Sequence, residues 1–162
     1  MHSREDGTAV STITLGRATP EEFPAIRQHA LDDYTRDGRV GAWATAEIAR
    51  QEFERLLPHG LDTENHHLLA IRSEGRQIGY LWLTSLQRPT GAEAFLLDLV
   101  IFPPFRRKGY GQTALLQLEA YVSSLGLKTI SLSVLPHNAA AQALYQKASY
   151  FPVFTRMTKK LG

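Results

Sequence analysis

Apolar residues recur along the chain with two periods, one typical of strands and one typical of helices. Alternation or short apolar runs predict strands over residues 12–17, 67–72, 77–84, 95–102, 128–134 and 154–159. A spacing of three to four predicts helices over residues 19–37, 45–57, 112–125 and 138–147. Residues 85–92 fit a loop, and residues 1–11 a flexible polar extension. This order favours one α/β domain over residues 12–162, with a mixed sheet of about six to seven strands flanked by about four helices.

The rest of the chain is arranged around residues 95–122. Residues 95–102 are apolar except for Asp98, which fits a strand covered on both faces. Two prolines end this strand, and the basic turn RRKGYG follows at residues 106–111. The glycines of this turn allow backbone conformations that other residues resist, and an amphipathic helix begins directly after it. A helix N-terminus beside three cations is physically a site for an anion such as pyrophosphate.

Composition narrows the class of protein. With 162 residues, 43% hydrophobic and 21% charged, the chain has the composition of an ordinary globular domain. A net charge of +2 does not argue for nucleic acid as a partner. The absence of cysteine excludes disulfides, cysteine-ligated metals and an acyl-cysteine intermediate. Without a signal-peptide core or an apolar run near the roughly 18 residues of a membrane span, we expect a cytoplasmic protein with no membrane partner.

Two kinds of nucleotide site compete for the basic turn. The phosphate-loop pattern G-x-x-x-x-G-K-[ST] is absent, which argues against nucleoside triphosphate hydrolysis. Gly109, Gly111 and Ala114 match the dinucleotide pattern G-x-G-x-x-G/A. However, the next strand, residues 128–134, is followed by LPHN and has no acidic residue to hold a ribose. The dinucleotide interpretation is therefore disfavoured.

A third interpretation rests on two motifs. The segment VIFPPFRRKGYG, with its RxxGxG core at residues 106–111, resembles the acetyl-CoA-binding motif of the GNAT superfamily of N-acetyltransferases. Downstream, Asn138, Ala141, Leu144 and Tyr145, followed by Ser149 and Tyr150, are similar to the family segment N-x-x-A-x-x-L-Y-x-x-x-G-[FY]. The resemblance covers essentially residues 12–161. Ser149 replaces the usual glycine, and the last two family strands are expected to be abbreviated.

The resemblance implies acetyl-CoA as the acyl donor and assigns its contacts. Backbone N–H groups of the turn would cradle the pyrophosphate, with attraction from the three cations; the residues are Arg106, Arg107, Lys108, Gly109, Tyr110, Gly111, Gln112 and Thr113. The strand end Leu99, Val100 and Ile101 would offer backbone groups to the pantetheine arm, in a slot where this strand and the next diverge. Asn138 would contact the cofactor, although it also fits a plain helix cap.

Two residues are the candidates for proton transfer. The resemblance makes Tyr145 the acid that protonates or hydrogen-bonds the leaving thiolate, against the alternative of an aromatic residue packed in the core. The acceptor amine must lose a proton to attack. Asp98 is a candidate base because it is the one charge inside a buried strand, although a carboxylate tied to the backbone or to a hydroxyl is equally consistent.

The acceptor pocket has weaker signals. The family builds this pocket from the first two helices, their connection and the hairpin, which here points to Tyr34, Trp43 and Trp82, with Tyr80 as a further aromatic. Core packing is the alternative for these aromatics. His137 follows a strand beside the expected cleft, or is simply exposed. The adjacent histidines 66 and 67 have no partners at metal-ligand spacing and are expected at the surface, so no metal site is predicted.

The sequence therefore favours an acetyl-CoA-dependent N-acetyltransferase that acetylates a primary amine by direct attack in a ternary complex. Small-molecule and peptide amines both fit as acceptors, and a homodimer is consistent with the family. Two other classes stay open: a non-catalytic acyl-CoA-binding sensor on the same fold, and a nucleic-acid-binding module that uses the basic turn. The latter lacks a broad basic face and interleaved aromatics.

Overall fold

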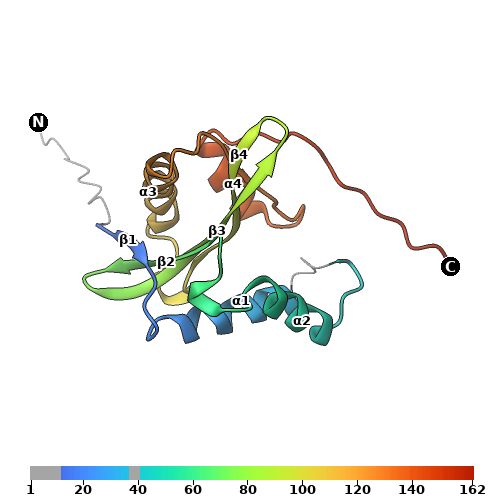
Figure 1. Cartoon of the computed structure of the whole chain (residues 1–162), viewed down its shortest axis with the longest axis horizontal. Helices are drawn as coiled ribbons and strands as arrows, with labels where there is room; N and C mark the ends of the chain where they lie inside the picture. The colour runs from blue at the N-terminus through green and yellow to red at the C-terminus, as the bar shows by residue number, and fades with distance from the viewer. Residues whose placement is uncertain (1–11, 37–40) are drawn as a thin grey trace, which may run out of the picture.

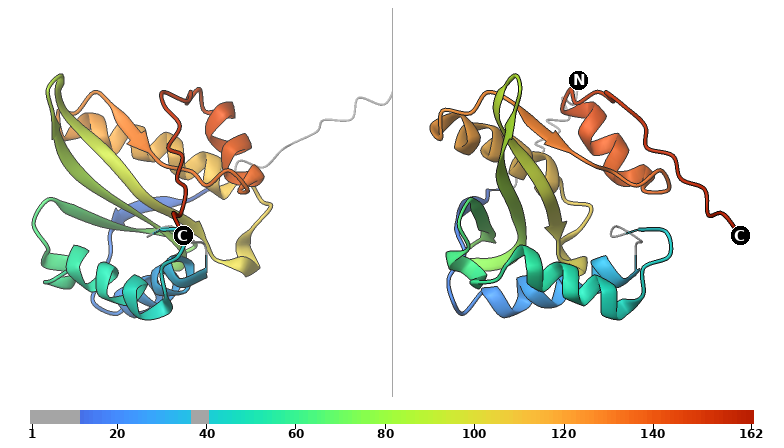
Figure 2. Two further views of the ribbon diagram at one scale, coloured as in Figure 1. Left: turned by 90° about the vertical axis from the view of Figure 1, so that its right-hand side faces the viewer. Right: turned by 45° about the vertical axis from the view of Figure 1, so that its right-hand side comes forward.

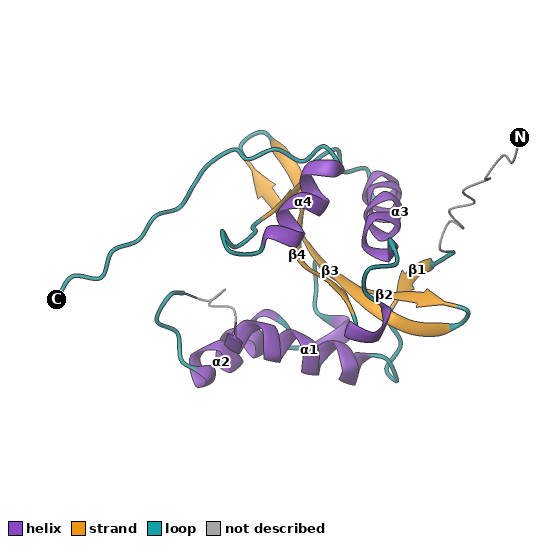
Figure 3. Ribbon diagram, turned by 180° about the vertical axis from the view of Figure 1, so that it is seen from behind, coloured by secondary structure: helices purple, strands orange, loops and turns teal. Residues whose placement is uncertain are grey.

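The computed structural model describes residues 12–36 and 41–162, which form three layers (Figures 1 and 3). The middle layer is a sheet of β1 (Thr14–Arg17), β2 (His66–Ser73), β3 (Arg76–Arg88), β4 (Gly91–Ile101) and β5 (Ile130–Leu132), in that spatial order. Helices α1 (Phe23–Arg36) and α2 (Ala46–Leu56) lie on one face. Helices α3 (Tyr110–Ser124) and α4 (Ala139–Lys147) lie on the other. Short 3₁₀ turns follow α2 and β4, at Gly60–Asp62 and Pro103–Phe105.

The predicted α/β class and the order of elements are confirmed up to α4. Strands β1 to β4 pair antiparallel, and β4 pairs parallel with β5 through the α3 crossover. The sheet has five strands in the described residues, fewer than the six to seven expected. The predicted extension, residues 1–11, and the predicted end of the first helix near residue 37 lie outside the described residues.

The predicted loop over residues 85–92 is wrong. Strand β3 continues to Arg88 and β4 begins at Gly91, so the two strands form a long arm that projects from the sheet (Figure 1). Arg88 and Gly91 are paired in register, and the Nε atom of Arg88 lies 2.7 Å from Oε1 of Glu93. Gly91 has a φ of 120°, which glycine adopts readily at a tight turn. Backbone pairing therefore extends the hairpin through a polar sequence.

The predicted final strand over residues 154–159 is also wrong. Residues 151–162 have no regular structure and are exposed. Strand β5 is shorter than expected, three residues instead of residues 128–134. A strand is stabilised by its neighbours, and β5 is paired on one side only within the described part of the chain.

Local signals account for the helix starts. The Thr45 hydroxyl accepts a hydrogen bond from the N–H of Ile48 at 3.2 Å, which caps α2. At α1, the Glu22 carboxylate accepts from the N–H of Thr19 at 2.9 Å, the reciprocal half of a capping box. The helix proper begins later than residue 19, at Phe23, because Thr19–Glu22 form a hydrogen-bonded turn first.

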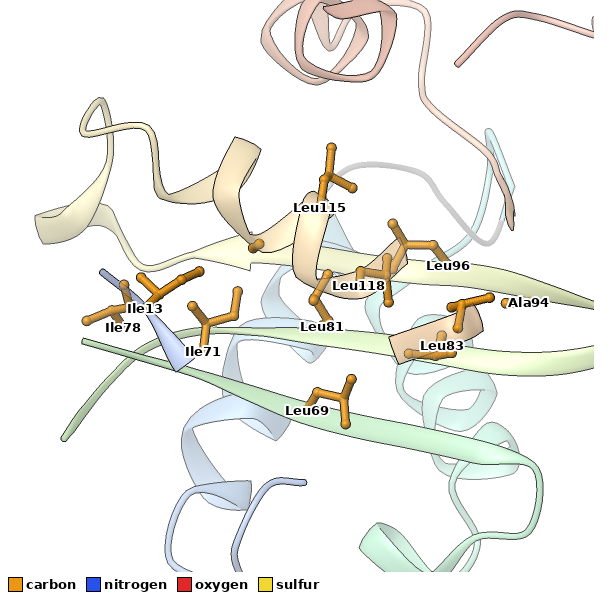
Figure 4. Close-up of a cluster of buried hydrophobic side chains, with 12 residues drawn as sticks. Ile13, Leu69, Ile71, Ile78, Leu81, Leu83, Ala94, Leu96, Leu115 and Leu118 are labelled. Atoms are coloured by element: carbon orange, nitrogen blue, oxygen red, sulfur yellow. The ribbon is translucent and has the colours of Figure 1, made fainter. Parts of the chain in front are cut away.

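Each face of the sheet buries its own core. The core between the sheet and α3 includes Leu81, Leu83, Leu96, Leu115 and Leu118 (Figure 4). The core under α1 and α2 is aromatic, and includes Tyr34, Phe53, Tyr80, Trp82 and Val100.

Strand β4 contributes to both cores and changes face partway along. Ala94 and Leu96 point into the α3 core, whereas Val100 points into the α1–α2 core, although all three are even-numbered. The change coincides with a β-bulge, because Trp82 pairs with Asp98 and the next residue, Leu83, pairs with Leu96. Leu97 is the extra residue, and it turns Asp98 towards α1 and α2.

Candidate functional site

The turn after β4 presents the N-terminus of α3. Gly109 caps the helix in a left-handed conformation, with a φ of 78°. The helical ladder begins with Thr113, whose N–H donates to the Gly109 carbonyl at 3.2 Å. The N–H groups of Tyr110, Gly111 and Gln112 consequently have no acceptor within the helix. Because the helix dipole adds about half a positive charge at this end, these groups form an anion-binding surface.

The three cations of the turn have different positions. The Nε atom of Arg106 donates to the carbonyl oxygen of Ile101 at 2.8 Å, so this side chain fastens the turn to the end of β4. Arg107 has a φ of 62°, an uncommon conformation for a residue with a side chain. Arg107 and Lys108 are exposed. The turn is thus held open to solvent with its positive charges at the start of α3.

The edge of β4 next to β5 is free at its C-terminal half. The parallel pairing covers only Ala94 to Leu96, opposite Ile130 to Leu132. Beyond this point β4 bulges at Leu97, and in the described residues no strand pairs with this edge at Leu99, Val100 or Ile101. An unpaired strand edge of this kind can pair with an extended ligand, and the pantetheine slot expected at these residues stays a prediction.

The opposite side of this strand end is held by a close backbone approach. A Cβ atom at Gly79 would lie 2.1 Å from the carbonyl oxygen of Val100. Only glycine fits at that position, which lets β3 contact the last residues of β4 directly. The N–H of Phe102 also donates to the Ile78 carbonyl at 2.8 Å. The end of β4 is therefore rigid where it enters the turn.

Helix α4 meets the turn at Gly111. A side chain at Gly111 would contact Cδ2 of Leu144 at 3.4 Å and Cδ2 of Leu99 at 4.0 Å, so this glycine lies where β4, α3 and α4 meet. Tyr145 follows in α4, half-buried, with its ring 5.7 Å from that of Tyr150 in an edge-to-face arrangement. Asn138 caps α4, because its Oδ1 accepts from the N–H of Ala141 at 3.1 Å. The two sequence motifs are thus brought together.

Asp98 is buried with a hydroxyl donor. Its Oδ2 accepts a hydrogen bond from the Tyr80 hydroxyl at 2.6 Å, and its side chain lies on the α1–α2 face of β4. Asp98 is 4% exposed and Tyr80 is 0% exposed. The carboxylate is therefore tied to a hydroxyl, one of the alternatives that the sequence left open, and it lies one residue after the bulge at Leu97.

The residues expected at the acceptor pocket divide into two groups. Tyr34 and Trp82 belong to the aromatic core under α1 and α2, with ring centroids 6.2 Å apart, and packing accounts for both. Trp43 is 55% exposed just before α2, and its ring faces the Lys160 ammonium at 5.8 Å. His137 is exposed in the loop before α4.

Two histidine contacts were missed from the sequence. Trp82 Nε1 donates to Nδ1 of His66 at 2.9 Å, and Nδ1 of His67 lies 2.8 Å from the Tyr121 hydroxyl. Both histidines are half-buried at the start of β2, so their expected surface position is wrong. Burial lowers the pKa of His66 and of His67. The one available signal was their place at the start of an alternating strand.

A hollow lies near these histidines, at the edge of the sheet away from the turn. Its volume is about 310 Å³, and its lining includes Arg17, His67 and Tyr121. Arg17 is already paired there with Asp62 at 2.7 Å. The lining of this hollow includes neither the glycine turn nor the N-terminus of α3. The site at Gly111 is therefore the stronger candidate. No group of three metal-binding side chains occurs in the described residues, and no helix in this part of the chain could cross a bilayer.

Comparison with known proteins places this geometry in a family. The sequence profile of the acetyltransferase (GNAT) family matches residues 21–150. YycN and YdgE of Bacillus subtilis (strain 168), both named uncharacterized N-acetyltransferases, are 32% and 33% identical to this chain, over 93% and 92% of its length and 99% and 98% of theirs. The crystal structure of YycN covers 93% of this chain and 99% of its own, at 33% identity, with a TM-score of 0.83.

A more distant enzyme shares the fold alone. The aminoglycoside N-acetyltransferase AAC(6')-Iy, solved in complex with CoA, is 13% identical and has a TM-score of 0.65. The alignment covers 93% of this chain and 95% of that one.

Proposed function

The chain belongs to the acetyltransferase (GNAT) family, and we propose that it transfers an acetyl group from acetyl-CoA to a primary amine, by direct attack in a ternary complex. One observation carries the proposal: the free edge of β4, the N-terminus of α3 and the helix that bears Tyr145 meet at Gly111. The three elements would serve different parts of an acyl-CoA reaction. The edge of β4 offers backbone groups to pair with, the N-terminus of α3 offers an anion site, and α4 offers an acid.

The residues of the turn fit the donor. The N–H groups of Tyr110, Gly111 and Gln112 would bind the pyrophosphate, and Arg107 and Lys108 would add attraction. The edge of β4 over Leu99, Val100 and Ile101 would pair with the amides of the pantetheine arm. Thr113 contributes less than expected, because its N–H and hydroxyl both donate to the Gly109 carbonyl. The donor supplies an activated thioester.

Tyr145 is the proposed acid. Transfer expels a thiolate, and a phenol beside the sulfur lowers the cost of that charge by donating its proton or a hydrogen bond. Tyr145 lies next to Leu144, which contacts the start of α3, and its side chain is only partly buried. Asn138 would act chiefly as the cap that fixes the start of this helix.

Asp98 is the proposed base, and the Tyr80 hydroxyl donates a hydrogen bond to it. Asp98 is 4% exposed and Tyr80 is 0% exposed, so the carboxylate, and not the hydroxyl that donates to it, is the group of this pair that the amine proton would reach. Both side chains face α1 and α2, and Trp43 lies in the loop just before α2, whereas Tyr145 belongs to α4 on the other face of the sheet. This division would bring acceptor and donor to the reaction from opposite sides of the sheet edge.

The acceptor is proposed only as a class, a small-molecule or peptide amine. The aminoglycosides acted on by distant structural relatives are not carried over, because those chains share the fold alone. Trp43 and His137 are the two expected acceptor residues that are exposed, and we retain both. Cytoplasmic location stays a prediction.

A thiol-release assay tests the activity directly. The protein has no cysteine, so a thiol reagent added to protein, acetyl-CoA and a panel of amines reports only the CoA that is released. We expect amine-dependent release above hydrolysis for at least one acceptor. Calorimetric binding of acetyl-CoA without any amine-dependent release would favour the non-catalytic sensor, and no binding at micromolar concentrations would refute the donor site.

Tyr145→Phe tests the acid, and Tyr150→Phe is its matched control. The two rings are neighbours, and the Tyr150 hydroxyl is buried with no hydrogen-bond partner in the described residues. We expect Tyr145→Phe to lower kcat by about 100-fold with little change in acetyl-CoA affinity. Tyr150→Phe should keep wild-type turnover. Equal turnover of the two variants would assign Tyr145 to packing.

A further inference from the structure

The first half of β2 has an open edge that a short turn covers. Strand β1 pairs only with residues 69–72 of β2, and no strand pairs with that edge over residues 66–68 in the described part of the chain. The 3₁₀ turn Gly60–Asp62 lies beside this edge instead. Thr63 holds the turn, because its hydroxyl donates to the Gly60 carbonyl at 2.9 Å. The hollow of about 310 Å³ lies between the turn, β2 and Tyr121 of α3.

The two histidines that line this hollow contact different layers. Helix α3 covers one face of the sheet, and α1 and α2 cover the other (Figure 2). His67 contacts Tyr121 of α3, whereas His66 contacts Trp82 of the core under α1 and α2. The indole N–H of Trp82 can only donate, so Nδ1 of His66, 2.9 Å away, accepts and carries no proton. His66 is therefore neutral, and its one N–H is at Nε2.

His67 and Tyr121 keep one donor between them. Nδ1 of His67 lies 2.8 Å from the Tyr121 hydroxyl oxygen. Burial lowers the pKa of His67 and raises the pKa of Tyr121, so both are neutral near pH 7. If Nδ1 donates, the hydroxyl proton of Tyr121 is left over. If the hydroxyl donates, the Nε2–H group of His67 is left over. One donor of the pair is thus available to a ligand in either case.

Arg17 brings a positive charge to the hollow and is held by one of its nitrogens. Its Nη2 atom donates to Oδ1 of Asp62 at 2.7 Å and to the Leu61 carbonyl at 3.1 Å. Its Nε and Nη1 atoms have no acceptor among the described residues. A guanidinium donates in a planar, fixed geometry that matches a carboxylate. Arg17 is therefore fixed at one end of its fork and open at the other.

The remaining polar groups of the hollow are mainly hydrogen-bond donors. They are Nε and Nη1 of Arg17, Nε2 of His66, and one group of the pair formed by His67 and Tyr121. The Asp62 carboxylate is already paired with Arg17. A set of donors around one cation favours a ligand that carries a carboxylate over a ligand that carries an amine.

We propose that this hollow binds a small organic acid, with its carboxylate on Arg17 and its hydrocarbon part against Leu61. Leu68 and Leu69 complete the apolar part of the lining. A volume of about 310 Å³ is at the lower end of the range for ligand pockets, so the acid is a small one. The site lies at the sheet edge away from the glycine turn, so it is separate from the proposed acetyl-CoA site.

An NMR titration of the full-length protein with butyrate tests the site, and butyramide is the uncharged control of similar shape. We expect saturable shifts of the amide signals of Arg17, His67 and Tyr121 at millimolar butyrate, and none with butyramide. No shift with butyrate, or equal shifts with both compounds, would overturn the proposal. Shifts centred on residues 106–113 would also overturn it, because butyrate would then occupy the proposed donor site. The titration needs no acetyl-CoA, so its outcome is independent of the proposed activity.

Arg17→Gln and Asp62→Asn are a matched pair of variants, because each breaks the same exposed ion pair. Their Tm values should agree closely, since such pairs contribute little to stability. Arg17→Gln loses the charged donors and should raise the butyrate dissociation constant at least about tenfold. Asp62→Asn removes a negative charge beside the ligand and should lower that constant by about threefold. Equal effects of the two variants would refute Arg17 as the partner of the carboxylate.

Acetate tests the hydrocarbon part of the ligand. It keeps the carboxylate and lacks two methylene groups of butyrate, so it should bind at least about threefold more weakly. Equal binding of acetate, or tighter binding of inorganic phosphate than of butyrate, would show that the hollow takes any small anion, and the organic acid would be refuted.

Discussion

Gly109 gives the sharpest test of the proposed pyrophosphate site, because Gly126 offers a matched control. The two residues flank α3, have the same φ of 78°, and have no atom within 4 Å of the position a Cβ would take. Alanine at either position meets no clash and suffers only the cost of a left-handed backbone, about 1–2 kcal/mol. Lower entropy of the unfolded chain offsets roughly 0.4–1 kcal/mol of that cost.

The two alanine variants should therefore lose the same stability and differ in binding. A net loss of about 1 kcal/mol corresponds to a fall in Tm of roughly 2–4 °C for a domain of this size, measured by calorimetry. Gly109→Ala also strains the cap that aims the first N–H groups of α3. Since one hydrogen bond to a charged group contributes about 1.5–3 kcal/mol, its acetyl-CoA dissociation constant should rise at least about tenfold. Gly126→Ala should bind as the wild type does.

One outcome would refute this reasoning. If Gly109→Ala loses stability as Gly126→Ala does and still binds acetyl-CoA with wild-type affinity, the start of α3 does not hold the pyrophosphate. Gly109→Asn is the conservative variant, because asparagine adopts the left-handed conformation more readily than alanine. It should recover part of the lost affinity.

Three further predictions concern single interactions. The pKa of Glu22 is lowered chiefly by the hydrogen bond that its carboxylate accepts from Arg72. The free energy of unfolding, measured in urea at pH 7, should therefore be about 1–2 kcal/mol higher for the wild type than for Glu22→Gln. This difference in stability should be complete above the pKa of about 4.3 in the unfolded chain, and it should disappear as the pH falls through the lower pKa of Glu22 in the folded protein. Asn138→Asp keeps the cap acceptor, so it should match the wild type in stability while Asn138→Ala loses about 1 kcal/mol; equal losses would refute the cap. Tyr80→Phe removes a donor to Asp98 and should lower the free energy of unfolding by about 1–3 kcal/mol and slow turnover without weakening acetyl-CoA binding; unchanged turnover would show that this hydrogen bond does not position Asp98 for proton transfer.

Much of the backbone geometry of the candidate site could be predicted because its signals are local. The stop at Pro103, the glycine that a left-handed cap requires and the amphipathic helix after it are all neighbours in sequence, and each restricts the backbone by its own chemistry. The same holds for Asn138, whose side chain caps the helix that begins one residue later. Such features can be read from the sequence because they do not depend on residues far away in the chain.

The parts that were mispredicted depend on distant partners. The arm over residues 85–92 is held by pairing between two strands, and its polar composition looked like a loop. Residues 151–162 contain apolar positions that looked like a final strand, but no strand of the sheet pairs with them in the described residues and they stay irregular. Likewise the burial of His66 depends on Trp82 across the sheet. The period of the hydrophobic residues does not show which distant strand or side chain will be the partner.

The bulge at Leu97 shows how one charged residue in a strand can indicate which face each side chain takes. Without it, strict alternation would put Asp98 on the same face as Ala94 and Leu96, inside an aliphatic core. A carboxylate buried there without a partner would cost several kcal/mol. One extra residue turns it to the face that carries Tyr80, which donates to it at 2.6 Å. The polar residue in an apolar strand was therefore a signal of irregular backbone as well as of chemistry, and the irregularity falls where β4 and β5 stop pairing and the proposed site begins.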